Sequence, residues 1–162
     1  MTARLTVKDK GYKALIKRLS YPPVSLTVGI HDEDNEVYDR GTGMEATTAM
    51  IGTFHEYGTV DMPPRPWLTP VVEAGWERYL TSVSLVEQAF VMGKLSAAER
   101  KMKLGVVGEK IVSDIIKHIK KQDFEPLAES TIMARKNEGS ITILIDSGQF
   151  WQSIGYEIKD SK

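Results

Sequence analysis

The sequence predicts an α+β fold, in which a small, mainly antiparallel sheet from both ends of the chain packs with two long helices and shorter helices. Three observations lead to this prediction. Stretches of alternating polarity lie towards both ends, at Val24 to Ile30 and at Ile154 to Lys159. Between them, the segments 68–90 and 97–121 repeat apolar residues every three or four positions. Strands that flank a run of helices, rather than alternating with them, are typical of α+β proteins.

Length and composition favour one domain. With 162 residues, of which 41% are hydrophobic, the chain can bury a single core, so we expect one domain over 1–162. No stretch approaches the roughly 20 apolar residues of a membrane-spanning helix, and the first residues lack the apolar core of a signal peptide. The chain has no cysteine, which excludes disulfides, thiolate metal ligands and a thiol nucleophile. We therefore expect a protein made in the cytoplasm, without membrane contact.

Charges of opposite sign gather in different parts of the chain, although the net charge is only −1. Residues 4–18 carry six basic side chains against one acidic side chain, and residues 31–45 carry six acidic side chains against one arginine. Residues 94–121 carry eight basic side chains against three acidic ones. Such blocks suit electrostatic matching between copies or partners at least as well as nucleic-acid binding. An ordinary solvated face explains each block equally well.

The N-terminal part is expected to contain a helix, a strand and a loop. The helix covers Tyr12 to Ser20, where apolar residues have helical spacing, and it ends before Pro22 because proline interrupts helices. The strand at Val24 to Ile30 follows. The segment from His31 to Gly43 is acidic and interrupted by glycine, so we expect an exposed acidic loop that is mobile in the free protein.

The middle of the chain is predicted to hold two helices joined by a proline-rich turn. A helical pattern runs from Met44 to Tyr57, and Gly58 is placed to end it. The turn MPPRPW has three prolines in four positions, which excludes regular structure. The long helix after it has Thr69 as its expected cap and Pro70 in its first turn. Its expected apolar face consists of Leu68, Val72, Trp76, Tyr79, Val83, Val86 and Phe90.

A second long helix is predicted from Ala97 to Lys121, after Gly93 and Ser96 interrupt the chain. Gly105 and Gly108 lie on one side of this helix, where we expect them to mark close packing rather than a ligand. The expected apolar face consists of Leu104, Val107, Ile111, Ile115 and Ile119, with Val112 and Ile116 beside them.

The C-terminal part is predicted to alternate between short helices and strands. A helix is expected at about Leu127 to Lys136, and a strand from Ile141 to Asp146. Asp146 stands three residues before Gln149, the spacing of a capping box that begins a helical turn. The final strand, from Ile154 to Lys159, is expected in the same sheet as the strand at Val24 to Ile30.

The patterns of metal and catalytic sites are incomplete in this chain. His55 and Glu56 lack the second histidine of a zinc-binding H-E-x-x-H helix, because Thr59 occupies its position, although His31 and Asp32 can join them across space. The acidic segment alternates carboxylates as a calcium loop does, but it has Val37 where such a loop requires glycine. Neither a nucleophile elbow nor a phosphate-binding loop is present. We therefore expect no catalytic residue, no metal and no cofactor.

Four segments that follow one another resemble motifs of one group of phage proteins. They are IGTFHEYGT, MPPRPWL, PLAESTIMARK and LIDSGQFWQSI. In this order, over about Val24 to Ile158, they are similar to the tail-completion or neck proteins of tailed bacteriophages. Trp67 stands where phenylalanine is usual, and no proline precedes the final strand. The matching residues are His55, Glu56, Tyr57, Gly58, Met62, Pro63, Arg65, Pro66, Trp67, Leu68, Pro126, Leu127, Thr131, Ile132, Lys136, Leu144, Ile145, Asp146, Gly148, Phe150, Ser153 and Ile154.

The resemblance implies a non-enzymatic structural protein of the virion, made in the cytoplasm of the bacterial host. Such a protein forms a ring of identical copies in the neck or head–tail connector, and it contacts other neck, adaptor and tail proteins. DNA passes through the channel without sequence-specific binding. A turn locked by prolines presents its arginine and tryptophan in a fixed geometry, and both residue types often dominate interfaces. The expected contact residues are Glu56, Tyr57, Met62, Pro63, Pro64, Arg65, Pro66 and Trp67.

Three alternatives accompany this interpretation. Trp67 can begin the core face of its helix while Arg65 pairs with Glu56, and this arrangement is compatible with a contact role for the turn. The basic helix 97–121 can instead grip DNA phosphates in an accessory module, although no aromatic side chains among its lysines are placed to stack on bases. A metal-dependent hydrolase is the least favoured alternative.

Overall fold

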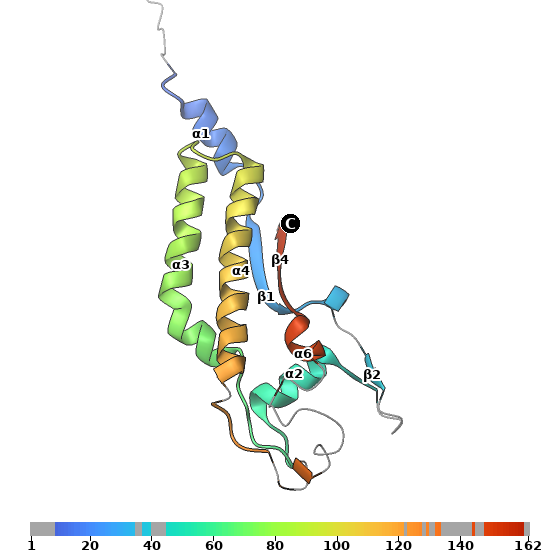
Figure 1. Ribbon diagram of the computed structural model, residues 1–162. Coiled ribbons are helices and arrows are strands. Elements are labelled where there is room, and N and C mark those ends of the chain that lie inside the picture. The colour runs from blue at the N-terminus through green and yellow to red at the C-terminus, as the bar shows by residue number, and fades with distance from the viewer. Residues whose placement is uncertain are drawn as a thin grey trace, which may run out of the picture.

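The computed structural model describes residues 9–34, 37–39, 45–121, 123–127, 129, 132–133, 144 and 148–160. Its two longest helices, α3 (Thr69–Val91) and α4 (Ala97–Lys121), run antiparallel and lie side by side (Figure 1). The strands β1 (Val24–Ile30) and β4 (Ile154–Asp160) form a two-stranded antiparallel sheet next to α4. The predicted α+β class, with a sheet from both ends of the chain, is confirmed.

The pairing of β1 with β4 follows the alternation of their residues. Leu26 lies opposite Ile158, and Val28 lies opposite Tyr156. Because successive strand residues point to opposite faces, Leu26, Val28 and Ile30 share one face, and all three pack against the hydrophobic core. α4 covers that face and contacts both strands. Both predicted strands and their shared sheet are confirmed.

Two glycines let α4 approach β4 closely. A Cβ atom added at Gly108 would lie 2.5 Å from Cγ of Tyr156, and one at Gly105 would lie 3.1 Å from its hydroxyl oxygen. Both glycines are buried under this tyrosine. The predicted close packing is therefore confirmed.

The hydrophobic core lies between α3, α4 and the sheet. All five residues of the predicted α4 face are buried, and so are Tyr79 and Phe90 of α3. Trp76, however, is 58% exposed, so its expected place on the buried face of α3 is wrong. α3 buries the side that carries Gly75 and Tyr79, and position 76 lies about 100° further around the helix than Gly75. The indole instead lines the edge of a groove, together with residues of β1 and α4.

The short helix α2 (Thr48–Tyr57) begins later than the predicted start at Met44. Thr47 caps it, because its hydroxyl accepts a hydrogen bond from the N–H of Met50 at 3.3 Å. A capping residue has an extended backbone, and Thr47 also ends the strand β3 (Glu45–Thr47). Gly58 ends the helix as predicted, with a φ of 74°.

The segment from His31 to Gly43 is not a loop throughout. It contains the 3-10 turn η1 (Asp32–Asp34) and the strand β2 (Val37–Asp39), which pairs with β3. The prediction of a loop is wrong at β2, because backbone pairing with β3 orders a stretch that buries little apolar area. Asp32, Asp34 and Val37 are exposed, as expected. Residues 35, 36 and 40–43 lie outside the described part of the chain.

The remaining helices are short. α1 (Tyr12–Leu19) agrees with its prediction, and α6 (Gln149–Gln152) has Gly148 at its N-cap. The expected helix at Leu127 to Lys136, the expected strand at Ile141 to Asp146 and the cap Asp146 lie largely outside the described residues. Leu144 is described, and it stands in a turn with a φ of 61°, so no strand forms at that position. Among the helices of the described segments, none has the length and apolar character needed to cross a membrane.

Candidate functional site

The turn between α2 and α3 folds back onto the end of α2. An added Cβ at Gly58 would lie 2.8 Å from the carbonyl oxygen of Met62, and the φ of 74° also favours glycine there. Thr59 and Met62 exchange backbone hydrogen bonds across the turn. The N–H of Arg65 then donates to the carbonyl oxygen of His55 at 2.6 Å. These bonds hold the turn against α2.

Glu56, on α2, caps the N-terminus of α3. Its carboxylate accepts hydrogen bonds from the N–H groups of Trp67 at 2.8 Å, Leu68 at 3.0 Å and Thr69 at 2.9 Å. The first N–H groups of a helix have no partners within the helix, and a negative charge suits the positive end of the helix dipole. The prediction that Thr69 is the cap is wrong, because Leu68 occupies the N-cap position and the carboxylate arrives from another helix.

The pKa of Glu56 reflects this environment. Burial raises the pKa, but hydrogen bonds from the Thr69 side chain and from the N–H groups of Leu68, Thr69 and Trp67 outweigh burial and lower the pKa below its ordinary value. The carboxyl group is therefore ionised at neutral pH. A carboxylate that accepts three backbone hydrogen bonds stabilises the joint between two helices, and this explains why a charged group is 92% buried, with only 8% of Glu56 exposed.

Arg65 connects the turn to the segment that follows α4. Its side chain is buried, and the residue is only 3% exposed. Nε donates to the carbonyl oxygen of Glu125 at 2.9 Å, and Nη2 donates to that of Pro126 at 3.0 Å. The considered ion pair with Glu56 does not form within the described part of the chain, because that carboxylate faces the N-terminus of α3.

Trp67 belongs to the core, as one of the alternatives predicted. It is 5% exposed, and its Nε1 donates to the carbonyl oxygen of Gly52 at 2.9 Å. Its ring packs edge to face on Phe150, with ring centroids 5.2 Å apart. Gly52 makes room for both rings, because an added Cβ would lie 3.2 Å from Phe150 and 3.3 Å from Trp67. The tryptophan thus joins α2 to α6.

The residues predicted to form a contact surface therefore divide into three groups. Glu56, Arg65 and Trp67 are buried within the chain and hold the turn in place, whereas Met62 and Pro66 are partly buried. The exposed members are Tyr57, Pro63 and Pro64.

Tyr57 also belongs to an exposed apolar surface whose other members sequence reasoning missed. Met50, Phe54 and Tyr57 lie on one side of α2, and Val60 follows in the turn. We call these four residues the α2 patch. Met50, Phe54 and Tyr57 are four and three positions apart, which indicates one face of a helix. Buried helix faces have the same spacing, so the sequence alone does not show that this face is exposed.

The segments that carry the family resemblance meet around Trp67. Glu56 binds the N-terminus of α3, Arg65 binds the carbonyl group of Pro126, and Trp67 packs on Phe150. These contacts join parts of the chain that are separated by 11, 61 and 83 positions. Other residues of the resemblance, namely Thr131, Lys136, Ile145 and Asp146, lie outside the described part of the chain.

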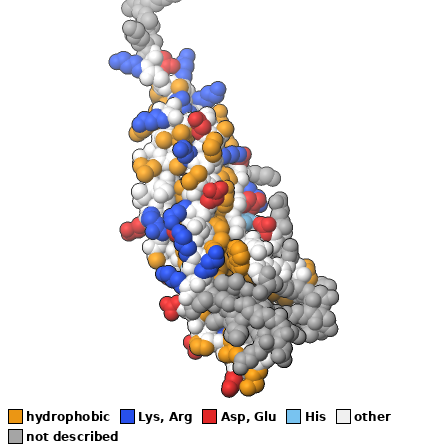
Figure 2. All heavy atoms as spheres, in the orientation of Figure 1, with side chains coloured by type: hydrophobic (Ala, Val, Ile, Leu, Met, Phe, Trp, Pro, Cys, Tyr) orange, Lys and Arg blue, Asp and Glu red, His pale blue; other side chains and the backbone are white. Residues whose placement is uncertain are grey.

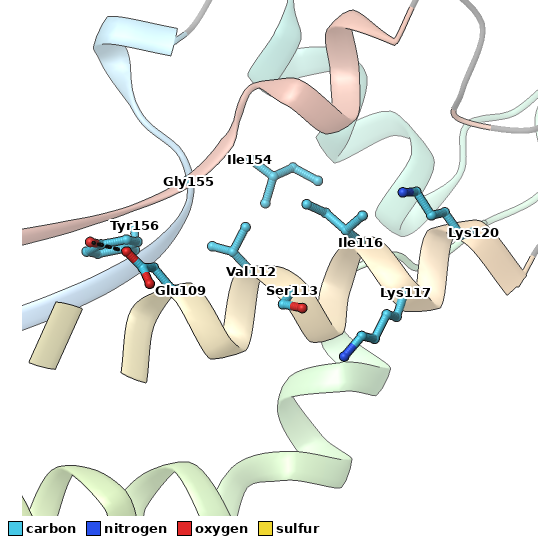
Figure 3. A pocket seen from close by; sticks show the side chains of 9 residues that line it. All are labelled: Glu109, Val112, Ser113, Ile116, Lys117, Lys120, Ile154, Gly155 and Tyr156. Atoms are coloured by element: carbon cyan, nitrogen blue, oxygen red, sulfur yellow. Dashed lines mark hydrogen bonds between the residues drawn. The ribbon is translucent and has the colours of Figure 1, made fainter. Parts of the chain in front are cut away.

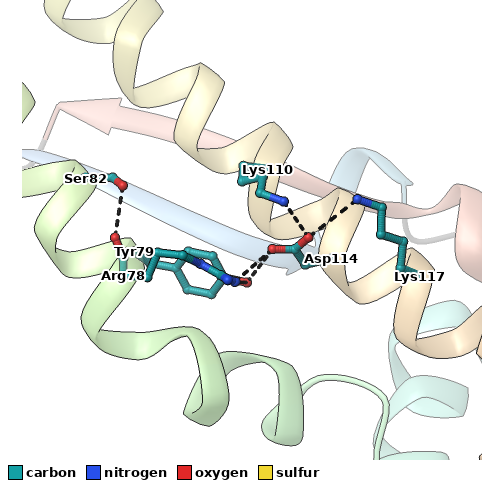
Figure 4. A network of polar contacts seen from close by, with 6 residues as sticks. All are labelled: Arg78, Tyr79, Ser82, Lys110, Asp114 and Lys117. Atoms are coloured by element: carbon teal, nitrogen blue, oxygen red, sulfur yellow. Dashed lines mark hydrogen bonds and ion pairs between the residues drawn. The ribbon is translucent and has the colours of Figure 1, made fainter.

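A separate polar network joins α3 and α4 (Figure 4). The carboxylate of Asp114 lies 3.0 Å from the guanidinium of Arg78 and 2.8 Å from Nζ of Lys110, and it accepts a hydrogen bond from the hydroxyl of Tyr79. Partial burial raises the pKa of Asp114, but the bonds from Lys110 and Tyr79 and the nearby cations lower it below its ordinary value. Burial, together with Asp114, raises the pKa of Tyr79.

Many basic side chains of α4 are paired within the chain. Besides the Asp114 network, Lys101 bonds Asp160 at 2.8 Å, and Arg100 bonds Glu87 at 2.7 Å. Lys120 lies over the ring of Trp151, 5.2 Å from its centroid. In Figure 2, Lys and Arg side chains gather over the lower half of α3 and α4. Intramolecular pairing reduces the charge that this surface can offer to phosphates.

A shallow groove runs between α4 and β4 (Figure 3). Its floor is apolar, formed by Val112, Ile116 and Ile154, and Lys117 and Lys120 stand at one end. Throughout the described residues, no three histidine or carboxylate side chains are grouped as metal ligands. The groove therefore offers apolar contact rather than a constellation of reactive groups.

Comparisons with protein-family models, with curated proteins and with solved structures found no match for this chain.

Proposed function

We propose that this chain is a non-enzymatic structural protein of a tailed-phage virion, which forms a ring in the neck or head–tail connector. The ordered set of four segments resembling tail-completion and neck proteins is the origin of this proposal. The observation that carries it is the meeting of these segments around Trp67, through the bonds of Glu56 and Arg65 and the packing on Phe150. The contacts of Glu56, Arg65 and Trp67 give the resembling segments one common physical role, because they join these segments in the fold.

The joint supports this function by presenting a rigid surface. Buried Glu56, Arg65 and Trp67 fix the turn against α2, and the turn holds Pro63 and Pro64 at the surface beside the α2 patch, which includes Tyr57. A surface fixed before binding loses little conformational entropy when a partner binds. Exposed aromatic and apolar residues gathered in this way are typical of protein contact sites. We therefore assign contact with a neighbouring virion subunit to this surface, and not to the side chains of Arg65 and Trp67.

The competing DNA-binding function receives less support. The basic side chains of α4 that would grip phosphates include Lys101, Lys110 and Lys117, and each lies close to a carboxylate of its own chain. Binding phosphates would require these pairs to exchange partners. A protein held to DNA by such contacts loses affinity steeply as the salt concentration rises.

Native mass spectrometry and negative-stain electron microscopy of the purified chain test the proposed function. We expect closed rings of a single copy number, with a central opening. A chain that stays monomeric at every concentration, and binds duplex DNA with a steep salt dependence, contradicts the proposal and favours the DNA-binding module.

A further inference from the structure

The helix α1 has an apolar face that the described part of the chain leaves uncovered. Tyr12, Leu15, Ile16 and Leu19 recur at the spacing of one helix face, and they are 37% to 69% exposed. No residue of the helix is buried. Figure 1 shows α1 beyond the ends of α3 and α4, at one end of the molecule. A helix of this length gains little stability by itself, so packing of its apolar face on a partner would stabilise it.

A groove suited to such a helix lies between α3 and β1, with Leu104 and Ile111 of α4 also in its lining. Its lining is mainly apolar and includes Val24, Leu26 and Val83, and its volume is about 280 Å³. Trp76 and Leu80 also line it, although they are 58% and 51% exposed. Exposed tryptophan at the edge of an apolar groove is typical of a binding surface, because tryptophan is among the residues that contribute most to interfaces. Binding a partner gives a role to the Trp76 side chain, which does not belong to the hydrophobic core of its own chain.

The charges of the two surfaces are complementary. Lys13 and Lys17 lie on α1 beside its apolar face. On α3, Glu73 and Glu77 are exposed within one helical turn of Trp76, and Glu87, which is paired with Arg100, lines the groove itself. A basic helix and an acidic groove edge attract each other and set the orientation of docking.

The chain directs α1 away from its own groove. The residues after α1 are attached beside the end of α3, where Tyr21 packs edge to face on Phe90 with ring centroids 5.5 Å apart. The carbonyl oxygen of Pro22 accepts a hydrogen bond from Arg100 at 3.4 Å. The chain is held at this point before it enters β1. As a result, α1 lies beyond the ends of α3 and α4 (Figure 1). The groove is thus left for a second molecule.

We propose that α1 of one copy docks its apolar face into the groove between α3 and β1 of the next copy. A helix that places residues at positions i, i+3, i+4 and i+7 in an apolar groove is a recurring mode of recognition. The two surfaces lie at different places on the molecule, so the contact is head-to-tail and generates a ring when the rotation closes. This inference rests on the proposed function, since it requires copies to assemble, and it names the contact between them.

Disulfide trapping tests the contact directly. The chain has no cysteine, so introduced cysteines form cross-links without background. We expect a chain carrying both Ile16→Cys and Leu80→Cys to give a ladder of covalent oligomers under mild oxidation, because docking brings the two positions within disulfide reach. The matched control carries Ile16→Cys and Met102→Cys, since Met102 is at least as exposed as Leu80 but lies on α4 outside the groove. This control is expected to give no ladder.

A complementation experiment tests the head-to-tail geometry. Ile16→Glu disables the helix, and Trp76→Glu disables the groove; both side chains are exposed, so each variant is expected to fold with an unchanged circular dichroism spectrum. Each change alone should weaken self-association by about 30-fold or more, equivalent to about 2 kcal/mol. An equal mixture of the two variants retains one intact contact per pair, and it should form dimers but no rings.

Each other outcome has a definite meaning. Cross-linked monomers without oligomers, or the absence of any cross-link, overturn the inference. Rings of the original chain that persist in both glutamate variants refute this contact and leave the proposed function standing. An original chain that stays monomeric, together with a double-cysteine variant that gives no ladder, removes both. Binding of α1 to vesicles of anionic lipid, lost in Ile16→Glu while assembly persists, identifies a membrane surface as the partner and also overturns the inference.

Discussion

Replacing Glu56 by glutamine tests whether one buried carboxylate joins α2 to α3. In the structure, one oxygen accepts from the N–H groups of Trp67 and Leu68, and the other accepts from the N–H group of Thr69. Glutamine has one acceptor oxygen and one amide donor, so at least one N–H group loses its partner and the others bind a neutral oxygen. A buried donor without a partner costs about 1 to 3 kcal/mol, and the loss of charge assistance adds to this cost. We expect Glu56→Gln to lower the free energy of unfolding by about 2 to 4 kcal/mol.

The effect should depend on pH in a defined direction. The folded state lowers the pKa of Glu56 below its ordinary value of 4.5. The stabilisation from the ionised carboxylate is therefore fully present above the ordinary pKa, and it is lost as the pH falls through the lowered pKa of the folded protein. The pKa of Asp114 is also lowered. Because Asp114 is present in both the original chain and Glu56→Gln, its contribution to the pH dependence cancels in the difference between their stabilities. The difference in stability between the original chain and Glu56→Gln should thus be constant near neutral pH and shrink in acid.

Equilibrium unfolding in urea, followed by tryptophan fluorescence at a series of pH values, measures this difference. Asp61→Asn is the matched control, because it makes the same carboxylate-to-amide change at an exposed position of the same turn. It should change the stability by about 0.5 kcal/mol or less. An unfolding midpoint of Glu56→Gln equal to that of the original chain at neutral pH, or a difference that persists unchanged in acid, refutes the capping role.

The other predictions concern packing and the proline turn. Trp67→Ala should cost about 3 to 5 kcal/mol of stability, because it empties a buried site, and a chain that melts normally would place this side chain outside the core. Arg65→Ala should lower the melting temperature even in the monomer, since it removes the donors to two carbonyl groups, at a cost of about 1 to 3 kcal/mol; an effect on assembly alone would argue for an interface role. Gly108→Ala should cost about 1 to 3 kcal/mol through its clash with the Tyr156 ring, and more than Gly105→Ala, whose added methyl group meets only the hydroxyl end of that side chain. Thermal unfolding compares the two glycine variants, and equal melting temperatures would contradict the packing described for α4.

Local patterns in the sequence were sufficient to predict much of the fold. The apolar repeat of α4 identified its bounds and its buried face, because a period close to that of the helix repeats over many turns. The alternation in β1 and β4 identified both strands in the same way. Gly58 was recognised as a helix end because a left-handed backbone favours glycine wherever it occurs. Each of these features depends on the residues themselves or on neighbours a few positions away.

Only the tertiary structure decided how the elements are joined. Any nearby carboxylate can cap a helix, and the fold of the proline turn selected Glu56 rather than the local hydroxyl of Thr69. The apolar stripe of α3 is wider than the surface that α4 covers, so periodicity placed Trp76 on the apolar side but could not reveal that it is exposed. The proline turn was expected to present Arg65 at the surface, yet its side chain is buried and donates to two carbonyl groups some 60 positions away. These outcomes depend on which groups meet across long separations in the chain, and short-range periodicity contains no information about such meetings.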